Sequence, residues 1–441
     1  MSRLKRLLSA PLNVVIFRAA QEIYIYLEQH FSAKWALKFD MTELLKRTQS
    51  TDLNELILHI ENVDYPAVTN SCSLIDYEEI LPGDKVRITK LAELSMSHHV
   101  DLLGSGMVHL GNKIDWHKDY KTGFTWPCIF FKKIEYTNLD QSSDVKFPWE
   151  LSRLQWLLPV GQAYILTGDD RYAEFARKII KSWKFANPYA HGINWASTME
   201  VALRIVTLTW LFKVFGKSPA WSAGNFRCDV LIEIFLHAHF TRRHLERSAV
   251  NGNHYTSNAV GLVFAGEFFA RRQVAGKWAD YGWSILNREI SLQTHSDGVN
   301  FEASVSYHRL VAELFFFAAR YRSIGGFDVS ARYRNFLLKI SDFCEAYISP
   351  DGMSPNWGDA DNARVLPFGG QDIQDHRYLP ELIRSQLESR GYRLSESASD
   401  TELIWCFGSS LRDHNKVSFD DNRSVAFRDG GVYVMGHKKN K

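Results

Sequence analysis

Three adjacent side chains at positions 253–255 combine an amide, an imidazole and a phenol. The stretch Asn251-Gly252-Asn253-His254-Tyr255 stands at the start of a segment whose body, AVGLVFAGEFF, is apolar, so we expect it to form the first turn of a buried helix. The free N–H groups of a helix N-terminus favour anions. These side chains are therefore candidates for holding a carboxylate, although Asn251 or Asn253 could serve only as a helix cap.

A tyrosine stands in the first turn of a second predicted helix. Asp297-Gly298 predicts a turn, Glu302 follows it, and Ser306-Tyr307-His308-Arg309 then opens a helical pattern in which Tyr307 shares a face with Leu310. A phenol can donate or accept a proton during catalysis. The alternative is that Tyr307 belongs to the core and that its hydroxyl only forms a structural hydrogen bond.

Two further groups of residues are candidates for contact with a sugar. Asn194-Trp195 begins a helix, where the indole could face a sugar ring, and Glu200 and Arg204 follow at a spacing that favours an ion pair on one helix face. Asp359 and Asp361 could form the carboxylate pair of a glycoside hydrolase, although a separation of two residues in a loop is weak evidence. The sequence contains no nucleophile elbow, phosphate-binding loop or histidine pair at metal-ligand spacing.

The elements that must position these residues are mostly helices. Successive helical hairpins with short loops can stack, and a closed stack would form a ring with a wide buried inner face. The segment 100–147 is richer in Gly, Asp and aromatic residues and predicts a long ordered loop. Apolar residues at helical spacing predict helices at 149–167, about 170–187, 195–216, 227–247, 254–272, 277–293, 302–323 and 331–349.

The pattern changes after residue 350. A loop is marked by Asp351-Gly352 and by the stretch PNWGDADN, and two shorter helices are predicted at 378–391 and 399–409. The sequence SVAFRDGGVYVMG at 424–436 alternates around a Gly-Gly turn and predicts a β-hairpin. We therefore expect a mainly α fold, an incomplete (α/α) toroid, with a short C-terminal hairpin that resembles the start of an antiparallel β-sheet domain.

Composition excludes several classes of protein. The chain has 441 residues, of which 45% are hydrophobic and 23% charged, which is enough to form a large core. A net charge of +2 does not favour nucleic acid as a partner, so an anion site must be local. The five cysteines are widely spaced and predict neither a disulfide framework nor a zinc site. The sequence has no run of 18 apolar residues, so it predicts no membrane-spanning helix.

The N-terminal residues leave the compartment open. Arg3, Lys5 and Arg6 precede an apolar stretch that ends near Phe17, as in a secretory signal. Pro11 interrupts this stretch and no clear cleavage site follows, so we favour an ordinary N-terminal helix and, slightly, the cytoplasm over the periplasm.

In this order, the motifs resemble the heparinase II/III family of polysaccharide lyases, which is similar to the toroid-type alginate lyases. The resemblance runs from about residue 144 to 436, roughly two-thirds of the chain. The matching stretches are DVKFPWELSRLQWLLPVGQAYILTGDDRYA, INWASTMEVALR, NGNHYTSNAVGLVFAGEFF, DGVNFEASVSYHRLV, NWGDADN and FRDGGVYVMG.

The resemblance implies β-elimination at a uronic acid, with no organic cofactor, and the sequence itself predicts no metal site. Carried over by position, it implies that Asn253, His254 and Tyr307 are catalytic. The family also uses a histidine of its β-sheet domain, beyond the Gly-Gly-x-Tyr-Val strand. His437 stands where the family usually has an arginine and is not assigned that role. The residues expected to bind substrate are Asn194, Trp195, Glu302, Arg309 and Trp357.

We therefore predict a polysaccharide lyase whose partner is an acidic, uronic-acid-containing glycan. The expected organisation is an N-terminal helical region at 1–100, the toroid with the active-site groove at 101–410, and the start of a β-sheet domain at 420–441. The chain alone would then be a weak or inactive lyase that needs a β-sheet partner. Two alternatives stay open: a non-catalytic glycan-binding or polysaccharide-assembly protein, and a toroid glycoside hydrolase.

Overall fold

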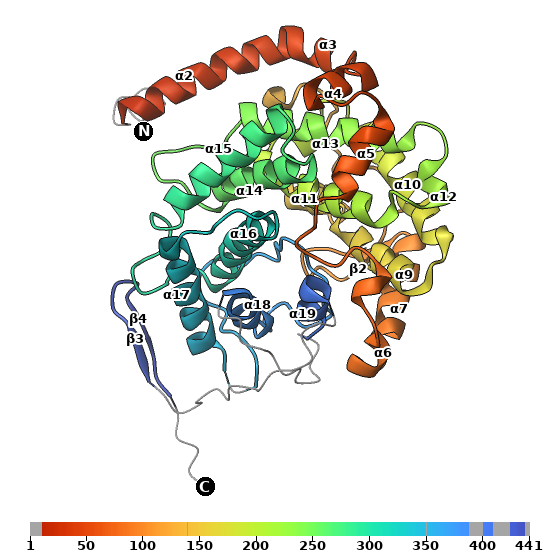
Figure 1. The fold of residues 1–441 in the computed structure, drawn as a ribbon. Helices are drawn as coiled ribbons and strands as arrows, with labels where there is room; N and C mark the ends of the chain where they lie inside the picture. Colours follow the sequence, from red (N-terminus) through yellow and green to blue (C-terminus); the bar gives the residue numbers. More distant parts are fainter. Residues whose placement is uncertain (1–10, 139, 350, 388–399, 409–423, 437–441) are drawn as a thin grey trace.

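Four helical hairpins follow one another around a ring (Figure 1). The computed structural model describes residues 11–138, 140–349, 351–387, 400–408 and 424–436. The inner helices are buried on nearly every side because they carry apolar residues all round. They are α9 (Leu158–Thr167), α11 (Thr198–Phe215), α14 (Asn253–Phe268) and α16 (Val305–Ile324), and their outer partners are α10 (Asp170–Ala186), α13 (Phe226–Arg243), α15 (Val274–Glu289) and α17 (Ala331–Tyr347).

Shorter elements precede, interrupt and follow the ring. None of the described helices is long and apolar enough to cross a bilayer. The remaining helices are α2 (Leu12–Leu27), α3 (Ala33–Ala36), α4 (Met41–Thr48), α5 (Leu53–Glu61), α6 (Tyr77–Ile80), α7 (Asp84–Met96), α8 (Lys146–Ser152), α12 (Pro219–Ser222), α18 (Tyr378–Leu387) and α19 (Asp400–Phe407). The short 3-10 and π turns are η1 (Glu28–Ser32), η2 (Ser71–Ser73), η3 (Phe131–Lys133), η4 (Gln155–Leu157) and η5 (Ile193–Trp195).

The fold confirms the expected incomplete toroid of helical hairpins and corrects one of its helices. The segment 149–167 is not continuous, because α8 ends at Ser152 and η4 separates it from α9. Leu154 takes a positive φ of 61° at the break. Pro159 lies in the first turn of α9. A proline cannot donate the hydrogen bond that a helix interior needs, so it marks a helix start rather than a continuation.

Strands are few and form two small hairpins. Within the predicted loop 100–147, β1 (His99–Asp101) pairs antiparallel with β2 (Met107–His109), with Val100 opposite Val108. At the other end, β3 (Val425–Phe427) pairs antiparallel with β4 (Val432–Val434), as the Gly-Gly turn predicts. The expected helical residues 388–391 and 399, and His437, lie outside the described residues.

The C-terminal hairpin rests on the ring. The Phe427 ring packs against Phe343 of α17, with centroids 4.9 Å apart. The Asp297 carboxylate accepts hydrogen bonds from the backbone N–H groups of Asp429 and Gly430 at 2.8 and 3.0 Å. The hairpin is thereby held next to the turn that leads into α16.

The connection between α5 and α6 passes across one end of the ring, between helices that lie far apart in the sequence (Figure 1). The Tyr65 ring packs against Phe264 of α14 and Tyr321 of α16. The Val68 N–H donates to the Trp405 carbonyl of α19 at 2.7 Å, and the indole N–H of Trp210 donates to the Val68 carbonyl at 3.0 Å. This segment therefore fills space that the inner helices leave open at that end.

Candidate active site

The N-terminus of α14 is capped by a carboxylate that comes from another part of the chain. Gly252 is the N-cap residue and has no side chain to offer. Instead, Glu302 accepts hydrogen bonds from the Asn253 backbone N–H at 2.8 Å and from the Asn253 side-chain amide at 2.7 Å. The expectation that Asn251 or Asn253 caps this helix is therefore wrong: the Asn251 side chain accepts from the Ser248 N–H and donates to Glu289.

His254 is oriented by Glu246. Its Nδ1 lies 3.1 Å from Glu246 Oε1, and half of the imidazole is exposed. Burial lowers the pKa of His254, but the hydrogen bond and charge of Glu246 outweigh burial and raise that pKa above its ordinary value. Glu246 also accepts from the Met199 N–H at 2.8 Å and from the Asn258 amide at 3.1 Å. The contact with Glu246 thus favours the protonated form of the imidazole and fixes its orientation at the start of α14, next to Asn253.

The Tyr307 hydroxyl donates to Asp359 Oδ2 at 2.7 Å. Tyr307 is half-buried in the first turn of α16. Burial raises the pKa of the phenol well above its ordinary value, and the hydrogen bond and charge of Asp359 raise it further. A proton on Tyr307 is therefore strongly held, and Asp359 determines where it points.

The loop that carries Asp359 is fastened to the start of α16. The Ser304 hydroxyl donates to the Asp359 carbonyl at 2.6 Å, and the Ser306 hydroxyl donates to the Asp361 carbonyl at 2.7 Å. The Val305 N–H donates to the Trp357 carbonyl at 3.0 Å. These bonds fix the backbone on both sides of Asp359, which places its carboxylate beside the phenol.

Basic residues of α8 and the following turn line the same region. Lys146 Nζ lies 3.0 Å from Asp361 Oδ2. Arg153 donates to both oxygens of Glu200, at 2.6 and 2.9 Å, and also to Glu150. Burial, with the charges of Glu200 and Asp361, raises the pKa of Glu150 to about 7 although Arg153 opposes it.

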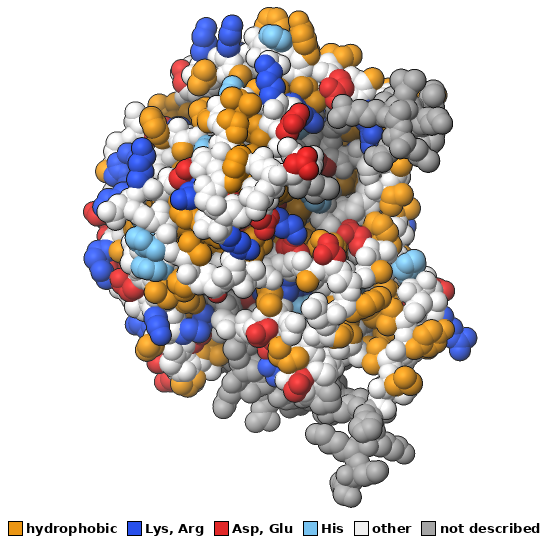
Figure 2. All heavy atoms as spheres, turned by 180° about the vertical axis from the view of Figure 1, so that it is seen from behind, with side chains coloured by type: hydrophobic (Ala, Val, Ile, Leu, Met, Phe, Trp, Pro, Cys, Tyr) orange, Lys and Arg blue, Asp and Glu red, His pale blue; other side chains and the backbone are white. Residues whose placement is uncertain are grey.

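These contacts bring the three predicted catalytic residues into one neighbourhood. His254 and Tyr307 lie in the first turns of α14 and α16, which pack against each other, and Glu302, two residues before the N-cap of α16, contacts Asn253 in the same turn of α14. The Trp357 side chain is 40% exposed beside them. The face of the molecule opposite to that in Figure 1 is hollowed near its middle, with acidic and basic side chains around the hollow (Figure 2).

Asn194 and Trp195 do not face a groove, which corrects the expectation that they bind substrate. Trp195 is 1% exposed, and its indole N–H donates to the Asn187 carbonyl. The Asn194 amide donates to the Trp116 carbonyl and to Asn187 Oδ1, both at 2.8 Å. Both side chains are enclosed by the core, so a sugar cannot reach them.

Arg309 and Arg204 are also structural. Arg309 is buried and donates to the carbonyls of Ile373 and Asp361 at 2.6 and 2.8 Å, so the expectation that it contacts substrate is corrected. Arg204 does not pair with Glu200, because Glu200 forms its ion pair with Arg153. It donates to the Asn194 carbonyl and to His237. Helical spacing alone could not show that a third residue, 47 positions away from Glu200, takes the partner.

Several residues at the site were not found from the sequence. Glu246, Lys146 and Arg153 have no motif of their own, and each meets its partner only after the ring has formed. Asp359 was noticed, but as one member of a hydrolase pair rather than as the partner of Tyr307. The one usable signal was that Lys146 and Arg153 belong to the stretch DVKFPWELSR, which carries part of the resemblance.

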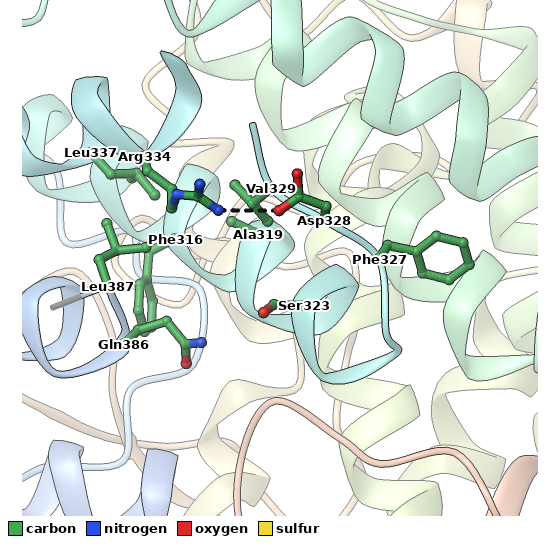
Figure 3. A pocket seen from close by; sticks show the side chains of 10 residues that line it. All are labelled: Phe316, Ala319, Ser323, Phe327, Asp328, Val329, Arg334, Leu337, Gln386 and Leu387. Atoms are coloured by element: carbon green, nitrogen blue, oxygen red, sulfur yellow. Dashed lines mark hydrogen bonds and ion pairs between the residues drawn. The ribbon is translucent and has the colours of Figure 1, made fainter. Parts of the chain in front are cut away.

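A separate cavity of about 410 Å³ lies between α16, α17 and α18 (Figure 3). Phe316, Val329 and Leu337 line it, and an ion pair between Arg334 and Asp328 lies at its side. It contacts the C-terminal half of α16, whereas Tyr307 lies in the first turn of that helix. None of the candidate catalytic residues lines it.

Comparison with known proteins identifies a family and several relatives that this chain resembles. The family described as Heparinase II/III N-terminus matches residues 86–367. A heparin-sulfate lyase of Bacteroides stercoris is 29% identical over 49% of this chain and 35% of its own length. A heparin-sulfate lyase of Pedobacter heparinus is 27% identical over 63% of this chain and 40% of its own length. The chain thus spans well under half of either relative.

A solved structure of heparinase III has a similar fold. It superimposes with a TM-score of 0.53 over 95% of this chain and 57% of the heparinase III chain, at 18% sequence identity. At this level of identity, the similarity concerns the fold of the helical ring.

Proposed function

Because the chain belongs to the heparinase II/III N-terminal family, we propose that it is the helical part of a polysaccharide lyase that cleaves a uronic-acid-containing glycan by β-elimination. The observation that carries the proposal is that Glu302, just before α16, holds Asn253 in the first turn of α14, so that Asn253, His254 and Tyr307 lie at the starts of two adjacent inner helices. The names of the two relatives make heparan-type glycans the first substrates to test.

The reaction needs a group that stabilises the uronate carboxylate. Removing the proton from the carbon beside that carboxylate spreads negative charge onto its oxygens, and fixed hydrogen-bond donors there lower the barrier. Asn253 has two amide hydrogens, and one of them is given to Glu302. The other is available to a substrate carboxylate, and a cationic His254 next to it supplies opposite charge.

The reaction also needs proton transfer at the glycosidic oxygen. As the carbon–hydrogen electron pair becomes a carbon–carbon double bond, the bond to the glycosidic oxygen breaks and that oxygen takes up a proton. We assign this proton to the Tyr307 hydroxyl. The proton removed from the carbon passes to a general base, and our candidate for that base is the histidine that the family carries in its β-sheet domain. The charge of Asp359 keeps the phenol protonated, and the hydroxyl hydrogen turns from Asp359 to the leaving oxygen when that oxygen accepts the proton.

A glycoside hydrolase that uses Asp359 and Asp361 has weaker support. An acid in such an enzyme needs a raised pKa. Burial raises the pKa of Asp361, but Arg153 and Lys146 outweigh it and leave that pKa below its ordinary value. Asp359 is engaged by Tyr307. A binding protein without activity keeps the same groove, so only an assay separates it from a lyase.

The decisive experiment is an assay of the purified chain, alone and with an added β-sheet domain from a full-length relative, on heparan, hyaluronan, alginate and capsular glycans, followed by absorbance of the unsaturated uronate. Growth of this band supports the proposal. New reducing ends without the band would indicate hydrolysis, and binding without either product would indicate a binding protein. Tyr307→Phe should abolish the signal, whereas Tyr433→Phe, an exposed phenol on β4, is the matched control and should not.

A further inference from the structure

Helix α2 has two apolar faces, and among the residues that the structure describes only one of these faces contacts the rest of the chain. It lies at the periphery, beside the ring (Figure 1). On its inner side Val14 is buried, and Phe17 and Tyr24 lie under the guanidinium groups of Arg247 and Arg243. At its end, the buried Glu28 accepts from the Tyr189 hydroxyl at 2.6 Å. The helix is thus firmly attached along this side.

The outer face of α2 carries a second apolar stripe. With 3.6 residues per turn, the residues of this stripe fall within about 100° of the helix circumference, opposite the attached side. The large side chains on it are unusually exposed: Leu12 74%, Ile16 61%, Ile23 62% and Leu27 39%. Ala19 and Ala20 complete the stripe between them. The family match begins at residue 86, so this surface is not part of the matched region.

The order of residues along the stripe is the same from the N-terminus as from the C-terminus. Measured from the point between Ala19 and Ala20, the isoleucines Ile16 and Ile23 are equally distant, and so are Leu12 and Leu27. In an antiparallel pair of identical helices with a twofold axis at that point, each leucine meets a leucine and each isoleucine meets an isoleucine. The two alanines at the centre let the helix backbones approach closely.

The charges of α2 lie away from this contact. Its two charged residues, Arg18 and Glu22, both fall outside the arc of the stripe, so the contact between two copies would be entirely apolar. A bilayer surface or an unrelated protein would not require the symmetry of the stripe.

We propose that α2 is a dimerisation helix that pairs antiparallel with α2 of a second copy of this chain. A single helical stripe is smaller than the roughly 800 Å² per partner of a standard stable interface. The dimer should therefore be reversible, with a dissociation constant on the order of micromolar.

The first test is sedimentation equilibrium of the full chain across a micromolar concentration series. We expect a monomer–dimer equilibrium. Ile16→Glu combined with Ile23→Glu should raise the dissociation constant by at least about 100-fold, because unpaired carboxylates would be buried at the contact. Phe185→Glu, at an exposed position on α10, is the matched control and should leave the constant unchanged. Unchanged circular dichroism shows that the variants are folded.

The second test is disulfide trapping, which reports the orientation. The exposed Cys72 and Cys128 are first replaced by serine. In the antiparallel pair, Ala19→Cys lies beside its copy and should form a covalent dimer. Leu12→Cys lies about 22 Å along the axis from its copy and should not. Equal trapping at both positions would indicate a parallel pair and overturn the proposal.

Two other outcomes would also overturn it. One is a chain that stays monomeric throughout the concentration series. The other is a monomer that floats with anionic phospholipid vesicles and loses this binding in the double glutamate variant, which would make the stripe a membrane-contacting surface. Neither outcome depends on lyase activity, so both are distinct from a failure of the proposed function.

Discussion

At the scale of single residues, Tyr307 and Asp359 behave as one unit. The Tyr307 hydroxyl group has one hydrogen, and it donates this hydrogen to Asp359 Oδ2. The carboxylate therefore holds the proton in the resting state, and the hydroxyl must turn away from Asp359 before it can donate to the glycan. This pairing suggests that the two residues contribute to turnover through a shared step.

We expect Tyr307→Phe to lower turnover by about 10²–10⁴-fold while leaving glycan binding nearly unchanged, because only proton transfer is lost. Asp359→Asn should cause a smaller loss. The double variant should be no slower than Tyr307→Phe alone, since both changes remove the same step. Steady-state kinetics and a binding titration measure these effects. Losses that multiply in the double variant would show that the two residues act separately.

The contact of His254 with Glu246 should make carboxylate binding at this site depend on pH. Burial lowers the pKa of the imidazole, but the hydrogen bond and charge of Glu246 outweigh burial and raise it above 6.5. The protonated fraction of His254 therefore grows as the pH falls below the raised pKa, and its contribution to stability and to carboxylate binding is lost as the pH rises through that pKa. Burial raises the pKa of Glu246, but the hydrogen bond and charge of His254 lower it, and the net effect is a decrease. At low pH the ion pair is therefore lost because Glu246 becomes protonated.

We therefore expect the affinity for a uronate oligosaccharide to fall as the pH rises through the pKa of His254. Calorimetric titrations at a series of pH values measure this affinity. Glu246→Gln should move this fall to lower pH, and NMR titration of the imidazole should show the same displacement. His254→Gln should remove the pH dependence from this region. An unchanged histidine titration in Glu246→Gln would contradict the assigned cause.

At the scale of elements, the site depends on a loop that is tied to a helix end. Gly358 takes a φ of 81°, and a Cβ there would lie 2.4 Å from the Ala303 carbonyl oxygen. The tight contact explains why the loop can approach α16 closely enough for Ser304 and Ser306 to bond its carbonyls.

Gly358→Ala should therefore push the loop away from α16 and displace Asp359. We expect a stability loss of at least about 1 kcal/mol from the positive φ alone, and a reduced turnover beyond it. Gly224→Ala is the matched control, because Gly224 has a φ of 64° but no atom within 4 Å of its Cβ position. Thermal denaturation should show similar backbone strain in both variants, whereas only Gly358→Ala should lose activity.

The ring could be predicted from the sequence because helical spacing and short loops repeat from one hairpin to the next. The identity of its wall residues could not. An indole such as Trp195 fits a core and a sugar groove equally well, and only its surroundings decide. Glu246 meets Met199 and Asn258 across two different helices, which no local pattern encodes. Pro159 was a visible signal for the break in 149–167, but the apolar periodicity concealed it.

At the scale of the whole molecule, a buried arginine connects the late elements to the ring. Arg364 donates to Glu313 of α16 and to Glu402 of α19, and both carboxylates are buried. Glu402 also accepts from the Gly369 N–H at 2.9 Å. The segment 364–369 is therefore held between an inner helix and the last described helix.

Arg364→Leu would leave two buried carboxylates without their cation. We expect a loss of about 3–5 kcal/mol in the free energy of unfolding, measured by urea denaturation. Arg334→Leu breaks the exposed ion pair with Asp328 and should cost no more than about 1 kcal/mol. Equal effects of the two changes would show that Arg364 does not hold these elements together.

The connection that contains Tyr65 and Val68 has a consequence for how the chain is made. Its contacts reach residues of α11, α14, α16 and α19, all of which leave the ribosome later. Contacts between residues so far apart in sequence form slowly, since a long loop must close first. The N-terminal segment must therefore wait, its apolar side chains unprotected, until about 340 further residues have been translated. The connection between α5 and α6 is thus packed only after the helices that it contacts have been made.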